Sequence, residues 1–100
     1  MSDDIGIVYA FEDVDGVVQT FKFRTYGWGS TICCEDESKI LSDDYVLIDK
    51  YLGRPVEKRH GKFGLNPDHS FVLRFKGQDV FRIDRMRKHI IKPLLPAVAA

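Results

Sequence analysis

The sequence has little cysteine, and the cysteine it has cannot build a disulfide framework. Its two cysteines, Cys33 and Cys34, are neighbours in the chain. A disulfide between neighbours is strained, and a β-strand would direct the two side chains to opposite faces. A zinc site would have to recruit His60, His69 or His89, and none of them lies at a recognisable ligand spacing. We therefore expect reduced cysteines, no metal and no cofactor.

Long hydrophobic runs are also missing. No apolar stretch approaches the ~20 residues that a membrane-spanning helix needs. The chain begins Met-Ser-Asp-Asp, which is acidic, whereas a signal peptide begins with basic residues followed by apolar ones. The sequence therefore predicts a cytoplasmic protein that makes no membrane contact.

Catalytic motifs are absent as well. The sequence contains no nucleophile elbow, P-loop, dinucleotide glycine fingerprint or His-Glu-x-x-His pattern. The stretch before Gly16 loosely resembles a calcium loop, but that alignment places Phe11 and Phe21 at ligand positions. We expect a protein that is not an enzyme. A small metal-free ribonuclease stays open, because it needs only a few convergent basic groups around a residue such as His60 or His69.

The chain does contain enough apolar material for one folded domain. Hydrophobic residues make up 44% and aromatic residues 12% of the 100 positions, which argues against disorder. A chain of this length buries roughly two thirds of its unfolded surface and has no room for a second core. We expect residues 1–100 to form a single domain.

Alternation of apolar and polar residues predicts a β-hairpin near the N-terminus. Its strands are residues 5–11 and 17–26, joined by a turn at residues 13–16 that contains the strong hairpin signal Asp-Gly. A short β-prone stretch, residues 31–34, predicts a third strand that leads into an acidic loop.

A second hairpin is predicted over residues 70–83. Phenylalanine and leucine occupy every second position of its first strand, and polar residues lie between them. Gly77-Gln78 fits a two-residue type II′ turn, because glycine in the first central position accepts the positive φ that this turn requires.

Two segments carry helix signals. Ser42 as N-cap, the acidic residues after it and Gly53 at the far end predict a helix over residues 42–52, although residues 45–48 also suit a strand. Apolar residues at helical spacing and basic residues in the last turns predict a second helix over residues 84–92. The predicted fold class is α+β, an antiparallel sheet of four or five strands built from the two hairpins, with two helices.

Zero net charge hides an asymmetry along the chain. Residues 1–50 carry eleven acidic and four basic side chains, and residues 51–100 carry four acidic and eleven basic ones. Either the two halves pack together and neutralise each other, or the fold displays separate acidic and basic surfaces. Separate surfaces would suit an acidic partner, a basic partner or nucleic acid.

The best candidate for a binding loop is the stretch of residues 54–67, which is basic, aperiodic and punctuated by glycine and proline. Loops of this length in compact domains are typically functional or mobile. Together with the basic residues near the C-terminus it forms the predicted partner or nucleic-acid surface. The predicted basic set is Arg54, Lys58, Arg59, Lys62, Phe63, Arg85, Arg87, Lys88 and Lys92, with Phe63 as an exposed aromatic; the predicted acidic face is Glu35, Asp36, Glu37, Asp43 and Asp44.

These patterns predict a small, non-catalytic, inhibitor-like regulatory module that docks on a protein partner through segregated acidic and basic surfaces, of the kind that phages encode. The alternative is a nucleic-acid-binding regulatory domain that uses the basic loop and the C-terminal helix. The apolar tail of residues 94–100 suits a homodimer contact.

The stretch Val-Phe-Arg-Ile-Asp-Arg-Met-Arg at residues 80–87 resembles the final strand of WYL regulatory domains, and residues 8–16 are similar to their opening strand and turn. The Tyr-Gly-Trp at residues 26–28 differs from the signature triplet of that family. The resemblance covers only these two stretches, so it implies a regulatory or nucleic-acid role and transfers neither a fold nor ligand residues.

Overall fold

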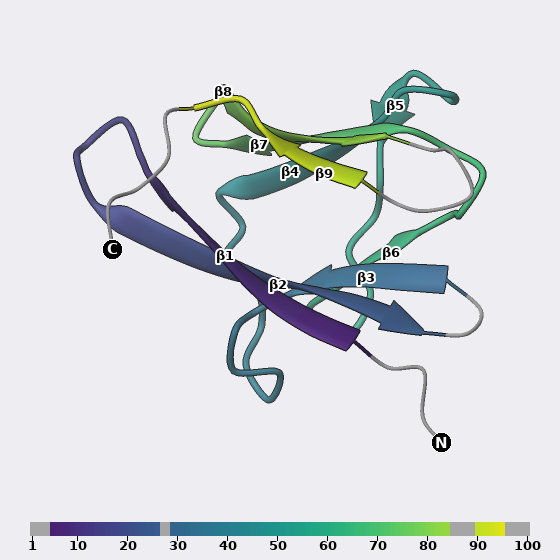
Figure 1. Ribbon diagram of the computed structural model, residues 1–100, viewed down its shortest axis with the longest axis horizontal. Helices are drawn as coiled ribbons and strands as arrows, with labels where there is room; N and C mark the ends of the chain where they lie inside the picture. The colour runs from purple at the N-terminus through teal and green to yellow at the C-terminus, as the bar shows by residue number, and fades with distance from the viewer. Residues whose placement is uncertain (1–4, 27–28, 85–89, 96–100) are drawn as a thin grey trace.

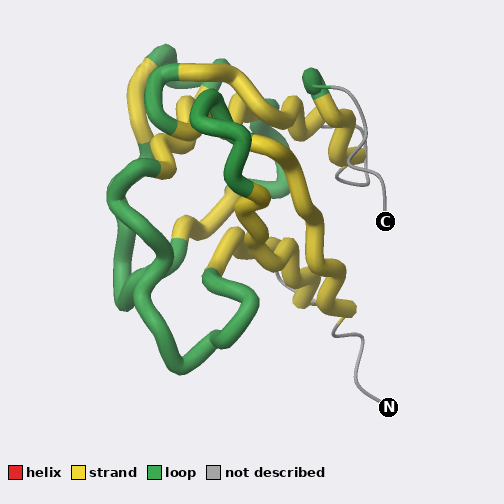
Figure 2. Tube along the Cα trace, turned by 90° about the vertical axis from the view of Figure 1, so that its left-hand side faces the viewer, coloured by secondary structure: helices red, strands yellow, loops and turns green. Residues whose placement is uncertain are grey.

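The computed structural model describes residues 5–26, 29–84 and 90–95, which form nine β-strands (Figure 1). The strands are β1 (Ile5–Glu12), β2 (Val18–Tyr26), β3 (Gly29–Cys33), β4 (Tyr45–Asp49), β5 (Arg54–Pro55), β6 (Phe63–Leu65), β7 (Phe71–Phe75), β8 (Gln78–Asp84) and β9 (Ile90–Pro93). Sheet A has the order β1-β2-β3-β6 and sheet B the order β5-β4-β7-β8-β9, and the neighbours in each sheet are antiparallel. Figure 2, coloured by secondary structure, shows strands and loops but no helix in this described part.

The two sheets enclose one aromatic core. Phe21 of sheet A meets Phe81 of sheet B edge to face at 5.0 Å between ring centroids, and Phe11 meets Phe75 in the same way at 5.5 Å. Such edge-to-face pairs are stabilising beyond the area they bury. Sheet A contributes Phe11, Phe21, Phe23, Ile32, Phe63 and Leu65, and sheet B contributes Tyr45, Leu47, Phe71, Leu73, Phe75, Val80, Phe81 and Ile83.

The N-terminal hairpin is confirmed. β1 pairs with β2 in register from Ile5↔Thr25 to Glu12↔Val18. Asp13 fixes the turn because its Oδ1 accepts the backbone N–H groups of Asp15 and Val17 at 2.8 and 3.0 Å. The predicted third strand is also present as β3, paired with β2.

The second hairpin is confirmed, but its turn lies one residue earlier than predicted. Phe75 pairs with Gln78, so Lys76 and Gly77 are the two central residues. Their φ values of 48° and 80° are both left-handed, which is typical of a type I′ turn and not of the predicted type II′ turn. A bulge at Val80 then allows both Val80 and Phe81 to be buried, because the pairing shifts between Leu73 and Arg74.

The predicted helix over residues 42–52 is wrong, and its apolar centre is strand β4. Tyr45, Leu47 and Asp49 are buried at alternating positions, and the strand pairs with β7 in the middle of sheet B. The apparent capping residues serve turns: Ser42 Oγ accepts the N–H of Asp44 at 3.2 Å, and Gly53, at φ 70°, donates its N–H to the carbonyl oxygen of Asp49. Caps and turns use the same residue types, so these signals do not separate the two structures.

The predicted helix over residues 84–92 is also wrong where the structure describes it. Asp84 is the last residue of β8, and Ile90–Pro93 form β9, which pairs with β8 at the edge of sheet B. Residues 85–89, with the predicted site residues Arg85, Arg87 and Lys88, lie outside the described residues. The described chain is therefore all-β and not α+β. It includes no helix with the length and apolarity that crossing a membrane requires.

Candidate functional site

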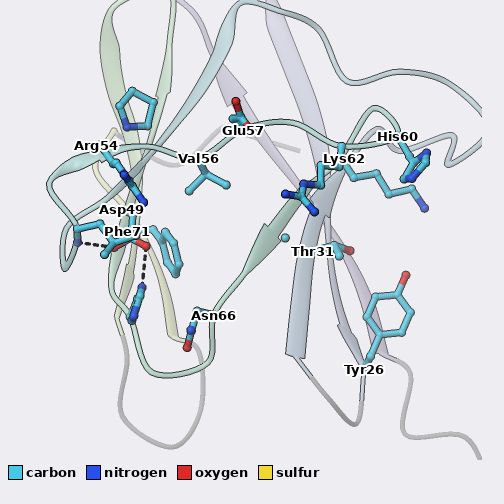
Figure 3. A pocket seen from close by; sticks show the side chains of 15 residues that line it. Tyr26, Thr31, Asp49, Arg54, Val56, Glu57, His60, Lys62, Asn66 and Phe71 are labelled. Carbon is cyan, nitrogen blue, oxygen red and sulfur yellow. Dashed lines mark hydrogen bonds and ion pairs between the residues drawn. The ribbon is translucent and has the colours of Figure 1, made fainter.

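A cavity of about 1030 Å³ is lined by residues of both edge strands, β5 of sheet B and β6 of sheet A (Figure 3). Most of its lining comes from residues 52–66, the connection that leaves sheet B after β4, supplies the edge strand of each sheet and returns toward β7. This connection overlaps the loop of residues 54–67 that the sequence predicted to bind a partner. The rest of the lining comes from Tyr26, Thr31, Asp49, His69 and Phe71, on strands or loops that the sheet pairing brings alongside.

Three cations in this cavity lack an acidic partner. Arg54, Arg59 and Lys62 all line it, and none forms an ion pair with a described carboxylate. Lys50 is the one other described cation without such a pair. The cations that form ion pairs with Asp or Glu are Lys22, Arg24, Lys39, Lys58, Arg74, Lys76, Arg82 and Lys92. The cavity therefore holds three of the four described cations that have no ion pair with Asp or Glu, alongside the carboxylates of Asp49 and Glu57.

Asp49 and His69 form a buried pair at one end of the cavity. Asp49 Oδ2 lies 2.6 Å from His69 Nδ1, and Asp49 Oδ1 accepts the backbone N–H groups of Tyr51 and Leu52 at 2.9 and 3.0 Å (Figure 3). Burial alone would raise the pKa of the Asp49 carboxyl, but the hydrogen bonds from His69 and from the two N–H groups outweigh burial and hold that pKa below its ordinary value. Asp49 is therefore ionised at neutral pH and fixes the orientation of the His69 ring.

The exposed Tyr51 covers this pair. Its ring stacks on His69 with 4.5 Å between the centroids and 23° between the planes, while 75% of the residue stays exposed. Leu52, half exposed, lies beside it on the cavity wall. Tyrosine and arginine are enriched among the residues that dominate binding energy, and Leu52 adds exposed apolar surface on the wall of the cavity; Tyr51 itself lies outside the lining.

A second group of residues lies on the outer face of sheet A. Thr31 and Gly64 are opposite each other in the pairing of β3 with β6, and Ile32 and Phe63, one position along, point into the core instead. Thr31 is 8% exposed, and its Oγ1 has no hydrogen-bond partner among the described residues. A Cβ added at Gly64 would meet nothing within 4 Å. Figure 3 shows Thr31, Lys62 and Tyr26 on one side of β6, and Asp49, Arg54 and Phe71 on the other.

Other predicted basic residues lie elsewhere. Lys58 forms an ion pair with Asp43 at 2.8 Å and donates to the carbonyl oxygen of Leu41. Phe63 was predicted to be exposed, but it is 3% exposed and belongs to the core. Lys92 pairs with Asp84 on β8 and β9, at the edge of sheet B opposite β5. Four strand spacings separate those edges, roughly 19 Å, so Lys92 and the cavity form no common patch.

The predicted acidic residues are largely occupied by hydrogen bonds or cations. Glu37 lies 2.9 Å from Lys22 Nζ and 2.6 Å from Arg24 Nη1. The hydrogen bond from Lys22, and after it the one from Arg24, lowers the pKa of the Glu37 carboxyl. Three others accept a hydrogen bond from a hydroxyl group: Glu35 from Thr20, Asp36 from Ser38 and Asp44 from Ser42. Asp36 also lies near Lys39, and Asp43 forms an ion pair with Lys58. Three of these five carboxylates, Asp36, Glu37 and Asp43, thus have a cation within 4.0 Å, whereas Glu35 and Asp44 accept hydrogen bonds, within the described part of the chain, only from hydroxyl groups.

Among the described residues, neither a reactive thiol nor a metal-binding cluster is present. Cys33 is a buried free thiol, and burial followed by the charge of Glu37 raises its pKa, which disfavours a nucleophilic thiolate. Among the described residues, no three His, Cys, Asp or Glu side chains gather as a metal ion would require. Cys34 is also free and is half-buried.

Comparison with known proteins adds no family. The chain matches no protein-family model, no curated protein and no solved structure. The resemblance of two short stretches to WYL domains gains no support from this, so function has to be argued from the cavity itself.

Proposed function

We propose that this chain is a small, non-catalytic, cytosolic binding module that docks on a protein partner and receives an acidic segment of that partner in the cavity between β5 and β6. The observation that carries this proposal is the gathering of Arg54, Arg59 and Lys62 in one cavity without ion pairs to described carboxylates. The sequence predicted two segregated charged surfaces. We narrow that hypothesis to this one basic site, because the predicted acidic residues are mostly paired.

Charge and shape both support an acidic peptide as the ligand. Arginine side chains bind carboxylates in a two-pronged geometry, and hydrogen bonds to charged groups are the stronger ones. The apolar residues of the lining, Leu52 and Val56, offer contacts to the apolar side chains of such a segment. An acidic segment with interspersed apolar residues would satisfy both features at once.

A nucleic acid suits the same site less well. Strong phosphate binding depends on many cations along one surface, and the affinity falls steeply with salt as counterions are displaced. Here most described cations outside the cavity already have carboxylate partners, and Lys92 lies on the far edge of sheet B.

The test compares two charge reversals at exposed cations that have no ion pair with a described carboxylate. Arg59→Glu places an acidic group in the cavity, and Lys50→Glu makes the same change outside it. The probe is a labelled peptide in which glutamate alternates with leucine, measured by fluorescence anisotropy. We expect Arg59→Glu to weaken binding by about tenfold and Lys50→Glu to leave it nearly unchanged.

Two outcomes would contradict the proposal. Equal weakening by both reversals would show attraction by net charge alone. Tighter binding of labelled single-stranded RNA or DNA than of the peptide, with a steep salt dependence, would favour the nucleic-acid alternative. Cleavage of that RNA in the presence of a chelator, lost in His69→Ala, would show an enzyme instead.

A further inference from the structure

The outer end of the cavity contains a notch that nothing in the described protein fills. Gly64 lies in the middle of β6, and the space where its side chain would stand is empty to 4 Å. Its φ is not left-handed, so the backbone does not require glycine. A glycine inside a strand is unfavourable unless another group approaches the backbone closely. The open space over the exposed Gly64 therefore leaves room for a ligand group close to the backbone.

The neighbouring Thr31 independently points to the same place. It lies opposite Gly64 on β3, and its buried Oγ1 has no hydrogen-bond partner among the described residues. A buried polar group without a partner is costly, and a valine of the same shape would avoid that cost. Oγ1 is covered in this structure, so the hydroxyl gains a partner when the Thr31 side chain turns toward the notch and a polar group of a ligand enters it.

The charge beside the notch selects the kind of ligand. Lys62, two residues before Gly64, is one of the cavity cations without an ion pair to a described carboxylate, and Figure 3 shows it on the same side of β6 as Thr31. A lysine ammonium and a hydroxyl can both donate hydrogen bonds to an anionic oxygen. Glu57, the acid nearest to Lys62 in the chain, also lines the cavity, but no atom of it lies within 4 Å of the position that a Cβ of Gly64 would take.

We infer that the notch over Gly64 is a subsite for one oxyanion group, a carboxylate or a phosphoryl group, which accepts hydrogen bonds from Thr31 Oγ1 and Lys62 Nζ. The inference rests on the proposed function, in which the acidic segment of the partner supplies this group. It adds a defined anchoring point on the outer face of sheet A to the broader attraction by Arg54 and Arg59.

The first test fills the notch. Gly64→Val places a β-branched side chain into the empty space of a strand, which should leave the fold intact. The matched control is Gly6→Val. Gly6 lies in the same row of the outer face as Gly64 but on β1, the opposite edge strand of sheet A. The row follows from the cross-strand pairs Gly6↔Arg24, Arg24↔Thr31 and Thr31↔Gly64. Backbone amide NMR shifts of the full chain are titrated with sodium phosphate and, separately, with sodium acetate.

Saturable shifts at Thr31, Lys62 and Gly64 are expected in the wild type and in Gly6→Val, and they should weaken by about tenfold or more in Gly64→Val. Saturation by phosphate alone assigns a phosphoryl group to the subsite, and saturation by acetate assigns a carboxylate. Absence of saturation with either anion, or equal affinities in the two glycine variants, would overturn the inference.

The second test separates binding from stability. Thr31→Val removes the unpartnered hydroxyl, so it should raise the melting temperature while weakening anion binding, and Thr31→Ser should keep the binding. A lower melting temperature in Thr31→Val would show that the hydroxyl is satisfied within the protein and would overturn the inference.

If the small anions bind as expected but the glutamate-leucine peptide does not, the subsite stands and the proposed function fails. If the peptide binds Gly64→Val as tightly as the wild type, the function stands and the subsite fails.

Discussion

Asp49 shows how one residue can serve both the fold and the site. It lies on the buried face of β4, together with the side chains of Tyr45 and Leu47. It nevertheless carries a negative charge, and three groups form hydrogen bonds with its carboxylate. A buried carboxylate is tolerated only when it is paired in this way. Its position ties the end of β4 to His69, before β7, and so shapes one wall of the cavity.

Removing this charge should destabilise the protein. Asp49→Asn leaves His69 Nδ1 facing an amide and weakens the bonds to the N–H groups of Tyr51 and Leu52. We expect a loss of about 1–3 kcal/mol in the free energy of unfolding at neutral pH, measured by urea denaturation. Glu57→Gln is the control, because Glu57 is exposed and has no partner among the described residues, and it should change stability little. An unchanged midpoint in Asp49→Asn would show that the pair contributes nothing to folding.

The individual residues of the site were only partly predictable from the sequence. Arg54, Arg59 and Lys62 were identified because charge and loop composition are local properties of the chain. Thr31 and Gly64 come from separate strands, and only the pairing of β3 with β6 makes them neighbours. For Asp49, the sequence offered one signal: this charged residue follows Tyr45 and Leu47 at the same two-residue spacing, so in a strand it would point to the same face as they do.

At the scale of elements, both hairpins could be predicted because period-two alternation and turn residues are local. The turn of the second hairpin was misplaced by one residue, because glycine suits either central position and only the pairing Phe75↔Gln78 decides. β4 and β9 were mistaken for helices, since short apolar segments fit both periodicities. β4 pairs with β7, which lies far along the chain, and β9 pairs with β8 across the intervening residues 85–89. These pairings make both segments strands, and a local sequence pattern does not reveal them.

The left-handed turn of the second hairpin gives a prediction at this scale. Gly77 has a φ of 80°, so Gly77→Ala forces a side chain into a conformation that costs about 1–2 kcal/mol. Gly64→Ala makes the same chemical change in a strand with open space and ordinary φ, so its melting temperature should be at or above that of the wild type. Thermal unfolding followed by circular dichroism measures both variants. Equal destabilisation would mean that loss of glycine itself, and not its backbone conformation, is responsible.

At the scale of the whole molecule, the fold interleaves the two charged halves of the sequence. Lys76 pairs with Asp15 at 3.2 Å, and Lys58 pairs with Asp43, so late cations meet early acids across the structure. Net charge along the chain could not predict this, because the pairing depends on which strands and turns the topology brings together. Three of the four described cations that remain without an ion pair lie in the cavity, and this group is the basis of the proposed function.

The same ion pairs determine how stability depends on pH. Hydrogen bonds or cations hold six carboxyl pKa values below their ordinary values, among them that of Asp43 through Lys58 and that of Asp84 through Lys92; the others are Asp13, Asp36, Glu37 and Asp49. A carboxyl whose pKa is lower in the folded state binds fewer protons there than in the unfolded chain, so acid favours unfolding.

We therefore expect the urea midpoint to fall progressively as the pH drops below about 5, where the unfolded carboxyls begin to take up protons, and to continue falling as the folded carboxyls protonate. Asp36 and Asp43 are exposed and Glu37 and Asp84 are half-buried, so added salt should make the fall shallower by screening their ion pairs, whereas Asp13 and Asp49 are buried and should be screened less. The Asp49→Asn variant should lose less stability than the wild type over the same pH range, because one of the six groups no longer titrates. A midpoint that stays constant or rises on acidification would show that these carboxylates are not held by their partners in solution, and that the cations of the fold are less fully paired than the charge argument for the cavity requires.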